Sequence, residues 1–231
     1  MATFTGGTGN DTVTATAGAI NDTLTGLAGN DTLIGLGGAD LLDGGSGNDT
    51  VDYTASAAAV NANLATLSAT GGDAQGDTYI SIENIIGSAL ADTLTGDIGN
   101  NVLTGAAGND QLFGGAGNDS LYGGADNDLI AGGAGNDVMD GGAGTSDTVD
   151  YTNSVAAVTV SLTANSATGG DATGDTIVNF ENVNGSAFDD VLTGDANANT
   201  LTGNAGNDTL SGAAGADSLY GGLGNDVLLG G

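Results

Sequence analysis

The sequence contains no lysine, arginine, histidine, cysteine, proline or tryptophan. Without cysteine there is no disulfide framework, no thiol nucleophile and no thiolate metal site. Without histidine there is no imidazole base and no Ser-His-Asp triad. Without cationic side chains, the acidic chain repels the phosphates of nucleic acids and the surfaces of anionic lipids. No apolar run approaches the roughly 18 residues of a membrane span. We therefore expect no nucleic-acid partner and no membrane insertion.

The acidic side chains have no partners of opposite charge within the sequence. The chain has 231 residues, of which 29 are Asp or Glu and 45 are Gly, and its formal net charge is −29. High net charge with few aromatic residues is typical of disorder, yet 39% of the residues are hydrophobic. Such a chain becomes compact only if an external cation offsets its charge. Oxygen-only ligands favour a hard divalent cation, with calcium first and magnesium second.

Internal repeats predict the fold. The segment 26–34 is followed directly by two further nonapeptides, 35–43 and 44–52, and the pattern recurs in blocks 6–52, 87–150 and 185–231. The eighth position of every unit is apolar: Val13, Leu24, Leu33, Leu42, Val51, Leu94, Leu103, Leu112, Leu121, Ile130, Met139, Val149, Leu192, Leu201, Leu210, Leu219 and Leu228. A flexible Gly/Asp-rich linker does not explain this column. It predicts short strands with one inward side chain each, separated by glycine turns.

The sixth position of the unit supplies the candidate metal ligands. It is Asp in almost every unit, and the exceptions are Asn101 and Asn199. The alternative role for these carboxylates is to cap turns by hydrogen bonding, but capping does not account for the uncompensated charge. We predict that calcium is bound by Asp11, Asp22, Asp31, Asp40, Asp49, Asp92, Asp110, Asp119, Asp128, Asp137, Asp147, Asp190, Asp208, Asp217 and Asp226. Asn101 and Asn199 lack the charge and predict weak or absent sites.

A longer repeat duplicates a whole module. Residues 51–133 match residues 149–231 at an offset of 98, so each module contains one nonapeptide block and one interlude, 53–86 or 151–184. In the interludes Val158, Val160 and Leu162 alternate with polar residues, and so do Ile80 and Ile82, which predicts further strands. We expect widened coils that continue the solenoid, and one elongated domain over residues 1–231.

The unit G-G-x-G-x-D-x-U-x resembles the calcium-binding nonapeptide of the RTX (repeats-in-toxin) family. The resemblance implies an all-β, parallel β-roll or β-solenoid in which successive half-turns alternate between two sheets. It also implies several calcium ions, held in the turns by the sixth-position carboxylates and by turn carbonyls. Members of the family are exported by type I secretion, so the expected location is extracellular or at the cell surface.

Residues of the interludes allow two interpretations each. Glu83 and Glu181 either complete a calcium site with Asp77 and Asp175, or are hydrogen-bonded or solvated strand residues, which is the interpretation we favour. The tyrosines are expected to pack beside the strands, with carbohydrate stacking as the alternative; they are Tyr53, Tyr122, Tyr151 and Tyr220.

The sequence favours a structural protein over an enzyme. Every unit offers equivalent acids and no aromatic-lined cleft is evident, so we expect neither catalysis nor a small-molecule substrate. Phe4 lies in the apolar column of an incomplete first unit, and the chain stops inside a turn at Gly231. The ends therefore predict head-to-tail stacking of copies into filaments or a surface layer. The alternative is an accessory calcium-binding segment of a larger secreted enzyme, toxin or adhesin.

Overall fold

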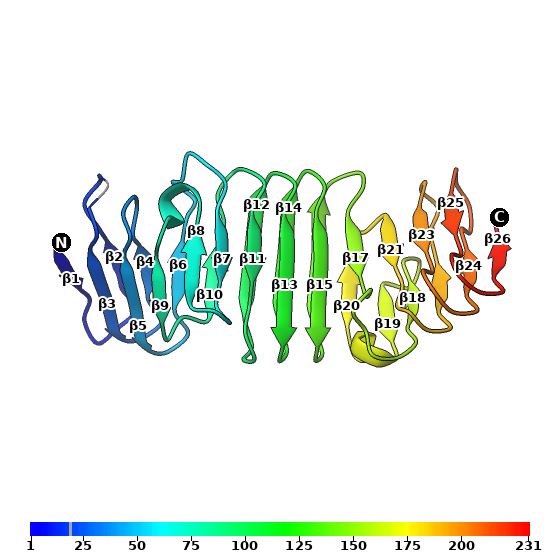
Figure 1. Cartoon of the computed structure of the whole chain (residues 1–231), viewed down its shortest axis with the longest axis horizontal. Coiled ribbons are helices and arrows are strands. Elements are labelled where there is room, and N and C mark those ends of the chain that lie inside the picture. The colour runs from blue at the N-terminus through cyan, green and yellow to red at the C-terminus, as the bar shows by residue number, and fades with distance from the viewer. Residues whose placement is uncertain (19) are drawn as a thin grey trace.

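The computed structural model describes residues 1–18 and 20–231 and consists of two 13-stranded sheets. The strands stack along one long axis, with the two chain ends at opposite ends of the rod (Figure 1). Within the described residues the only helices are two short 3-10 turns, η1 (Gly72–Ala74) and η2 (Gly170–Ala172). The chain is an elongated parallel β-solenoid, which confirms the predicted all-β roll.

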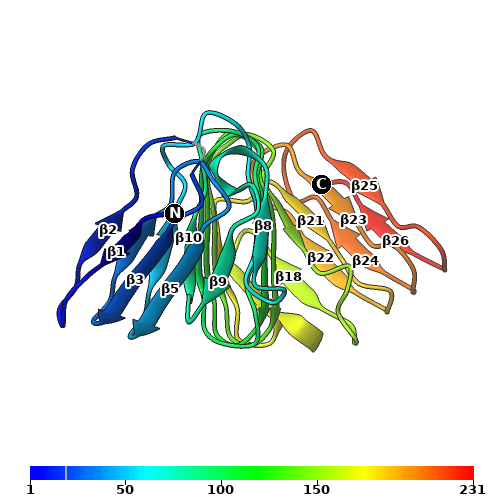
Figure 2. The ribbon, with the colours of Figure 1, turned by 60° about the vertical axis from the view of Figure 1, so that its left-hand side comes forward.

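Successive strands of the nonapeptide blocks alternate between the two sheets. Sheet A has the order β1 (Thr3–Thr5), β3 (Thr23–Ala28), β5 (Leu41–Ser46), β9 (Thr78–Ile80), β8 (Ser68–Thr70), β7 (Asn61–Asn63), β11 (Thr93–Thr95), β13 (Gln111–Ala116), β15 (Leu129–Ala134), β17 (Thr148–Asp150), β21 (Asn182–Asn184), β23 (Thr200–Thr202) and β25 (Ser218–Tyr220). Sheet B has the order β2 (Thr12–Thr14), β4 (Thr32–Ile34), β6 (Thr50–Asp52), β10 (Asn84–Ile86), β12 (Val102–Ala107), β14 (Ser120–Ala125), β16 (Val138–Ala143), β20 (Thr176–Val178), β19 (Ser166–Thr168), β18 (Thr159–Ser161), β22 (Val191–Thr193), β24 (Thr209–Ser211) and β26 (Val227–Leu229). Figure 2 shows β1, β3 and β5 side by side at one end of the rod.

The eighth-position column forms the core. In the parallel register Leu112 is paired with Ile130, and both side chains are fully buried between the sheets. The same holds along the rod until the last coils, where Leu219 is half-buried and Leu228 is 47% exposed. Each buried aliphatic side chain contributes about 1.5–3 kcal/mol, and strand geometry places only one such side chain inside per unit.

The two interludes interrupt the parallel order in opposite sheets. In the first, β7, β8 and β9 form an antiparallel meander inside sheet A, between β5 and β11. In the second, β18, β19 and β20 do the same inside sheet B, between β16 and β22. The 3-10 turns of the two interludes accordingly lie at opposite edges of the rod in Figure 1. The second module is therefore rotated by a half-turn about the long axis.

The strand predicted from Ile80 and Ile82 is present only as far as Ile80, the last residue of β9. Ile80 is 45% exposed, whereas Ile82 lies beyond the strand and is 6% exposed, so the two side chains do not share a face. Ser81 between them has a φ of 49°, a left-handed conformation that ends the extended backbone of β9. Tyr79 occupies the inward position instead and is 1% exposed. The other alternation holds, since Val158, Val160 and Leu162 are all buried. Among the residues described, no helix is long and apolar enough to cross a membrane.

Candidate metal centres

The sixth-position carboxylates form two columns, one at the turns that precede each sheet. Within a column, the backbone N–H of one Asp donates to Oδ1 of the Asp one coil further along the rod. Asp110 donates to Asp128 at 2.8 Å on the sheet A side, and Asp119 donates to Asp137 at 2.8 Å on the sheet B side. One oxygen of each carboxylate except that of Asp11, in the first coil, thereby joins successive coils.

The second oxygen of most of these carboxylates is buried and has no hydrogen-bond partner. Such orphaned atoms are costly, since burial removes their hydration and nothing replaces it. The pKa shifts have the same origin. Burial, followed by the charge of neighbouring carboxylates, raises the pKa of Asp110 to about 7 and that of Asp128 to about 6. The unpartnered atoms are Oδ2 of Asp22, Asp31, Asp40, Asp49, Asp110, Asp119, Asp128, Asp137, Asp147, Asp208 and Asp217.

In the described residues, all but one of these unpartnered oxygens face a space that a glycine leaves open; the exception is that of Asp22, whose unit begins with Ala17. A Cβ atom added to Gly105 would collide with Oδ2 of Asp110 and would lie 2.6 Å from the carbonyl oxygen of Gly123, one coil further on. Gly123 repeats the arrangement with Asp128 and the carbonyl of Gly141. Carboxylate and carbonyl oxygens are the donors that calcium prefers. No three acidic side chains converge among the described residues, so each site would combine carboxylates with backbone carbonyls.

The comparison with protein families agrees with this geometry. The family model of the RTX calcium-binding nonapeptide repeat matches residues 3–19, 16–51, 86–121, 113–146, 180–210 and 202–231, which together make up more than half of the chain. The chain belongs to this family. A search of curated proteins gave no match. The RTX matches leave out most of both interludes, and the residues inside them fit a hard cation less well, as described below.

The fifteen predicted ligands of the RTX units are not equivalent. All are buried except Asp11, Asp217 and Asp226, which are half-buried in the outer coils. Oδ2 of Asp92 accepts a hydrogen bond from the backbone N–H of Ser88, and the Ser88 hydroxyl donates to Oδ1 at 2.9 Å. Ser186 and Asp190 repeat this pair in the second module. In both modules the first unit after the interlude thus has its carboxylate already satisfied by a serine.

The side-chain amides of the two asparagines at the sixth position are also hydrogen-bonded. Oδ1 of Asn101 accepts the backbone N–H of Asp97 at 2.8 Å, and its Nδ2 donates to the carbonyl of Glu83 at 2.8 Å. Asn199 makes the same contacts with Asp195 and Glu181. A neutral amide replaces both a charge and a free oxygen here, and the weak or absent calcium sites at these two positions stay a prediction.

The glutamates are hydrogen-bonded members of the carboxylate columns. Oε2 of Glu83 accepts the backbone N–H of Asp49 at 2.8 Å, in the column of sheet B. Asp77 instead accepts the backbone N–H of Asp40, in the column of sheet A. The structure therefore does not bring Glu83 and Asp77 into one site, and the alternative of a shared calcium site between them is not supported.

Sequence reasoning missed the partner of the interlude aspartates. Tyr53 is 2% exposed, and its hydroxyl donates to Oδ2 of Asp77, the oxygen that has no partner in most of the nonapeptide units. Tyr151 donates to Asp175 in the same way. The 98-residue duplication preserves both members of the pair, and this was the signal in the sequence. Burial raises the pKa of Asp77 and that of Asp175 to about 7.

Proposed function

We propose that the chain is an extracellular, calcium-binding structural protein whose roll folds when calcium binds. The observation that carries this proposal is the set of eleven buried carboxylate oxygens without hydrogen-bond partners in the part of the chain that the structure describes. In the absence of a cation they make the folded state repel itself, because like charges are stacked one coil apart. A cation that binds the folded chain and not the unfolded one stabilises it by mass action.

Calcium titration followed by circular dichroism tests the coupling of binding and folding. We expect little β structure in chelator and a cooperative gain of β structure as calcium is added. Magnesium should substitute poorly, since it dehydrates reluctantly and demands a near-octahedral ligand set. Equal β content in chelator and in calcium would contradict the proposal.

The calcium concentration at the midpoint of the same titration tests whether the protein works outside or inside the cell. Calcium modules that work outside cells have dissociation constants of about 10⁻⁴–10⁻³ M, because calcium is abundant there. We propose that the chain is secreted, by type I export as is common among RTX proteins, and a midpoint in that range would support an extracellular role. A midpoint below about 10⁻⁶ M would be reached inside a cell and would count against it.

We further propose that copies associate head to tail. Among the described residues, strands β2 and β26 each pair with one neighbouring strand, and so do β1 and β25. A second copy stacked on the rod would place its Phe4 beyond Leu219 and its Val13 beyond Leu228, in line with the core columns. Leu228 is 47% exposed and Leu229 is 53% exposed, so the contact would cover apolar surface and pair open strand edges.

Sedimentation and negative-stain microscopy in calcium test this association. We expect filaments for the unaltered chain and dispersed rods for Phe4→Asp, because a carboxylate would enter the core column at the contact. Ile98→Asp is the matched control: Ile98 is 88% exposed in the middle of the chain, and its replacement should leave filaments intact. Dispersed 21.8 kDa rods at high protein and calcium concentration would refute head-to-tail assembly. The proposal that calcium binding drives folding would be unaffected by that result.

A further inference from the structure

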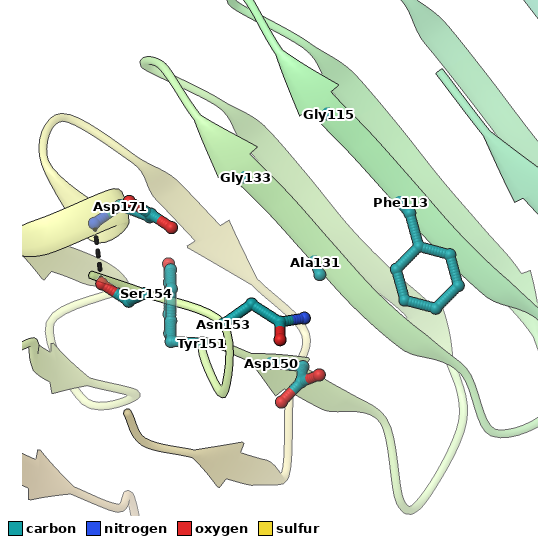
Figure 3. A pocket seen from close by; sticks show the side chains of 9 residues that line it. All are labelled: Phe113, Gly115, Ala131, Gly133, Asp150, Tyr151, Asn153, Ser154 and Asp171. Carbon is teal, nitrogen blue, oxygen red and sulfur yellow. Dashed lines mark hydrogen bonds between the residues drawn. The ribbon is translucent and has the colours of Figure 1, made fainter. Parts of the chain in front are cut away.

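A cavity of about 170 Å³ lies on the outer face of sheet A, beside the second interlude. Strands β13 and β15 supply its floor, and the turn after β17 together with η2 supplies its wall (Figure 3). The residues that matter for its chemistry are Phe113, Ala131, Gly133, Asp150, Asn153 and Asp171. None of them belongs to the carboxylate columns described above.

The floor of the cavity is apolar and shaped by small residues. Phe113 is paired with Ala131, and Gly115 with Gly133, in the parallel register of β13 and β15. In Figure 3 the ring of Phe113 and the side chain of Asn153 lie on either side of Ala131. The small side chain of Ala131 leaves the space between them open, so a ligand there would contact one face of an aromatic ring.

The wall of the cavity is acidic and held in place. Asp150 accepts hydrogen bonds from the backbone N–H of Thr152 at 3.3 Å and from its hydroxyl at 3.1 Å. Asp171 is anchored through its own backbone N–H, which donates to the hydroxyl of Ser154 at 3.0 Å. Both carboxylates are only half-buried. Because the chain contains no lysine, arginine or histidine, it has no side chain of its own to neutralise them.

The first module does not keep this arrangement. By strand register, Ile34 stands where the second module has Ala131, and Thr14 stands where it has Phe113. At the 98-residue offset Ala55 replaces Asn153, whereas Asp52 and Asp73 still correspond to Asp150 and Asp171. The acids are thus common to both modules. The aromatic ring, the open floor and the amide occur together only in the second.

We propose that this cavity binds a primary ammonium group carried on a short apolar stem. The stem would lie against Phe113 and Ala131, and the ammonium would face Asp150 and Asp171, with the Asn153 amide oxygen as a further acceptor. An aromatic face attracts an ammonium ion electrostatically, and carboxylates accept its hydrogen bonds. A bare metal ion fits less well because much of the lining is hydrocarbon. The site does not depend on the proposed structural role.

Titration of the full, calcium-saturated chain with n-butylammonium, followed by NMR shifts of the Gly133 and Asn153 amides, tests the proposal. We expect saturable binding, and much weaker binding of the neutral analogue n-butanol. Ala131→Ile places in the cavity the residue that the first module carries, and it should weaken binding by about tenfold or more. Asn153→Ala, which also restores a first-module residue, should weaken binding by a smaller factor.

The controls separate this site from general attraction of cations to an acidic rod. Asp171→Asn should weaken binding, whereas Asp73→Asn, the corresponding change in the first module, should leave it unaltered. Nα-acetyl-lysine amide serves as a second probe: if it binds too, the cavity accepts a lysine side chain, and if only n-butylammonium binds, it accepts a free amine. The proposal is overturned if n-butanol binds as tightly, if Asp73→Asn has the effect of Asp171→Asn, or if Ala131→Ile binds as the unaltered chain does.

Discussion

The hydroxyl of Tyr53 donates a hydrogen bond to Oδ2 of Asp77 across 2.9 Å, and a second phenol, Tyr79, lies 2.7 Å from the same hydroxyl. In most of the nonapeptide units this carboxylate oxygen has no hydrogen-bond partner. In the first interlude the hydroxyl of Tyr53 donates a hydrogen bond to this oxygen of Asp77. The columns of carboxylates therefore continue through the interludes, since Asp77 still accepts the backbone N–H of Asp40 at 2.8 Å, but this step of the column needs no metal.

Removal of that hydroxyl should destabilise the roll. Tyr53→Phe leaves Oδ2 of Asp77 buried without a donor, and such a loss costs about 1–3 kcal/mol. We expect a lower midpoint of thermal unfolding in saturating calcium. Tyr122→Phe is the control, because Tyr122 is 40% exposed and should tolerate the change. Equal midpoints for the two variants would show that the phenol contributes nothing to stability.

Replacing a carboxylate by an amide removes its charge and keeps an oxygen, and so distinguishes calcium ligands from side chains that only accept backbone hydrogen bonds. Asp119→Asn retains an oxygen to accept the backbone N–H of Asn101 but removes the charge at an unpartnered site. We expect a higher calcium midpoint in the circular dichroism titration, with the fold reached at saturation. Glu83→Gln should shift the midpoint less, since the Glu83 carboxylate already accepts the Asp49 N–H. A larger shift for Glu83→Gln would reverse our assignment of the metal ligands.

Acid should partly replace calcium. The pKa of Asp110 in the folded chain is about 7 and that of Asp119 is about 6, against an ordinary value of 3.8. The folded state then binds protons more tightly than the unfolded state. The stability from these groups is fully present below about pH 4 and is lost as the pH rises through 6 to 7.

Circular dichroism in chelator checks this pH dependence: β structure should be greater near pH 5 than near pH 8. Calcium binding should show the opposite pH dependence, because protons compete with calcium for the same carboxylates. The calcium concentration at the midpoint of folding should therefore rise on acidification. A chain that is unfolded in chelator at every pH between 4 and 8 would contradict the assigned pKa shifts.

The space between Gly105 and Asp110 should tolerate no side chain on Gly105. Gly105→Ala would place a methyl group against Oδ2 of Asp110, so we expect a higher calcium midpoint and a lower unfolding temperature. Gly9→Ala is the matched control, because a Cβ atom there has no neighbour within 4 Å. If the two variants titrate alike, the space beside Asp110 is not where the cation binds.

A backbone substitution in the opposite direction should stabilise the roll. Ala106 occupies the second position of its unit, where eight of the seventeen units have glycine, and its φ is 84°. An L-residue in this region is strained by about 1 kcal/mol or more, which glycine avoids. We expect Ala106→Gly to raise the unfolding temperature in calcium, as measured by calorimetry. A lower temperature would mean that the flexibility of glycine in the unfolded chain outweighs the strain.

The parts of the structure that repeat could be predicted from the sequence, whereas the parts that depend on one contact could not. The column from Val13 to Leu210 is buried because a period of nine residues brings every such side chain to the same place. The same regularity located Asp110 and Asp119. It could not show that Ser88 donates to the carboxylate of Asp92, because the second position of the unit varies from unit to unit. It could not show that Tyr53 reaches Asp77, because both residues lie in an interlude, outside the common period. The meander of the interlude also escaped prediction, since alternation alone does not reveal strand direction.

The half-turn between the modules has a consequence for how such a chain can change in length. Insertion or loss of a single nonapeptide would exchange the two sheets for everything downstream, and so would insertion of one whole 98-residue module. Two added modules would restore the original facing. A chain lengthened by one module would have its third meander in sheet A, on the same side of the rod as the first. A partner that binds one side of the rod would therefore contact a meander only at every second module.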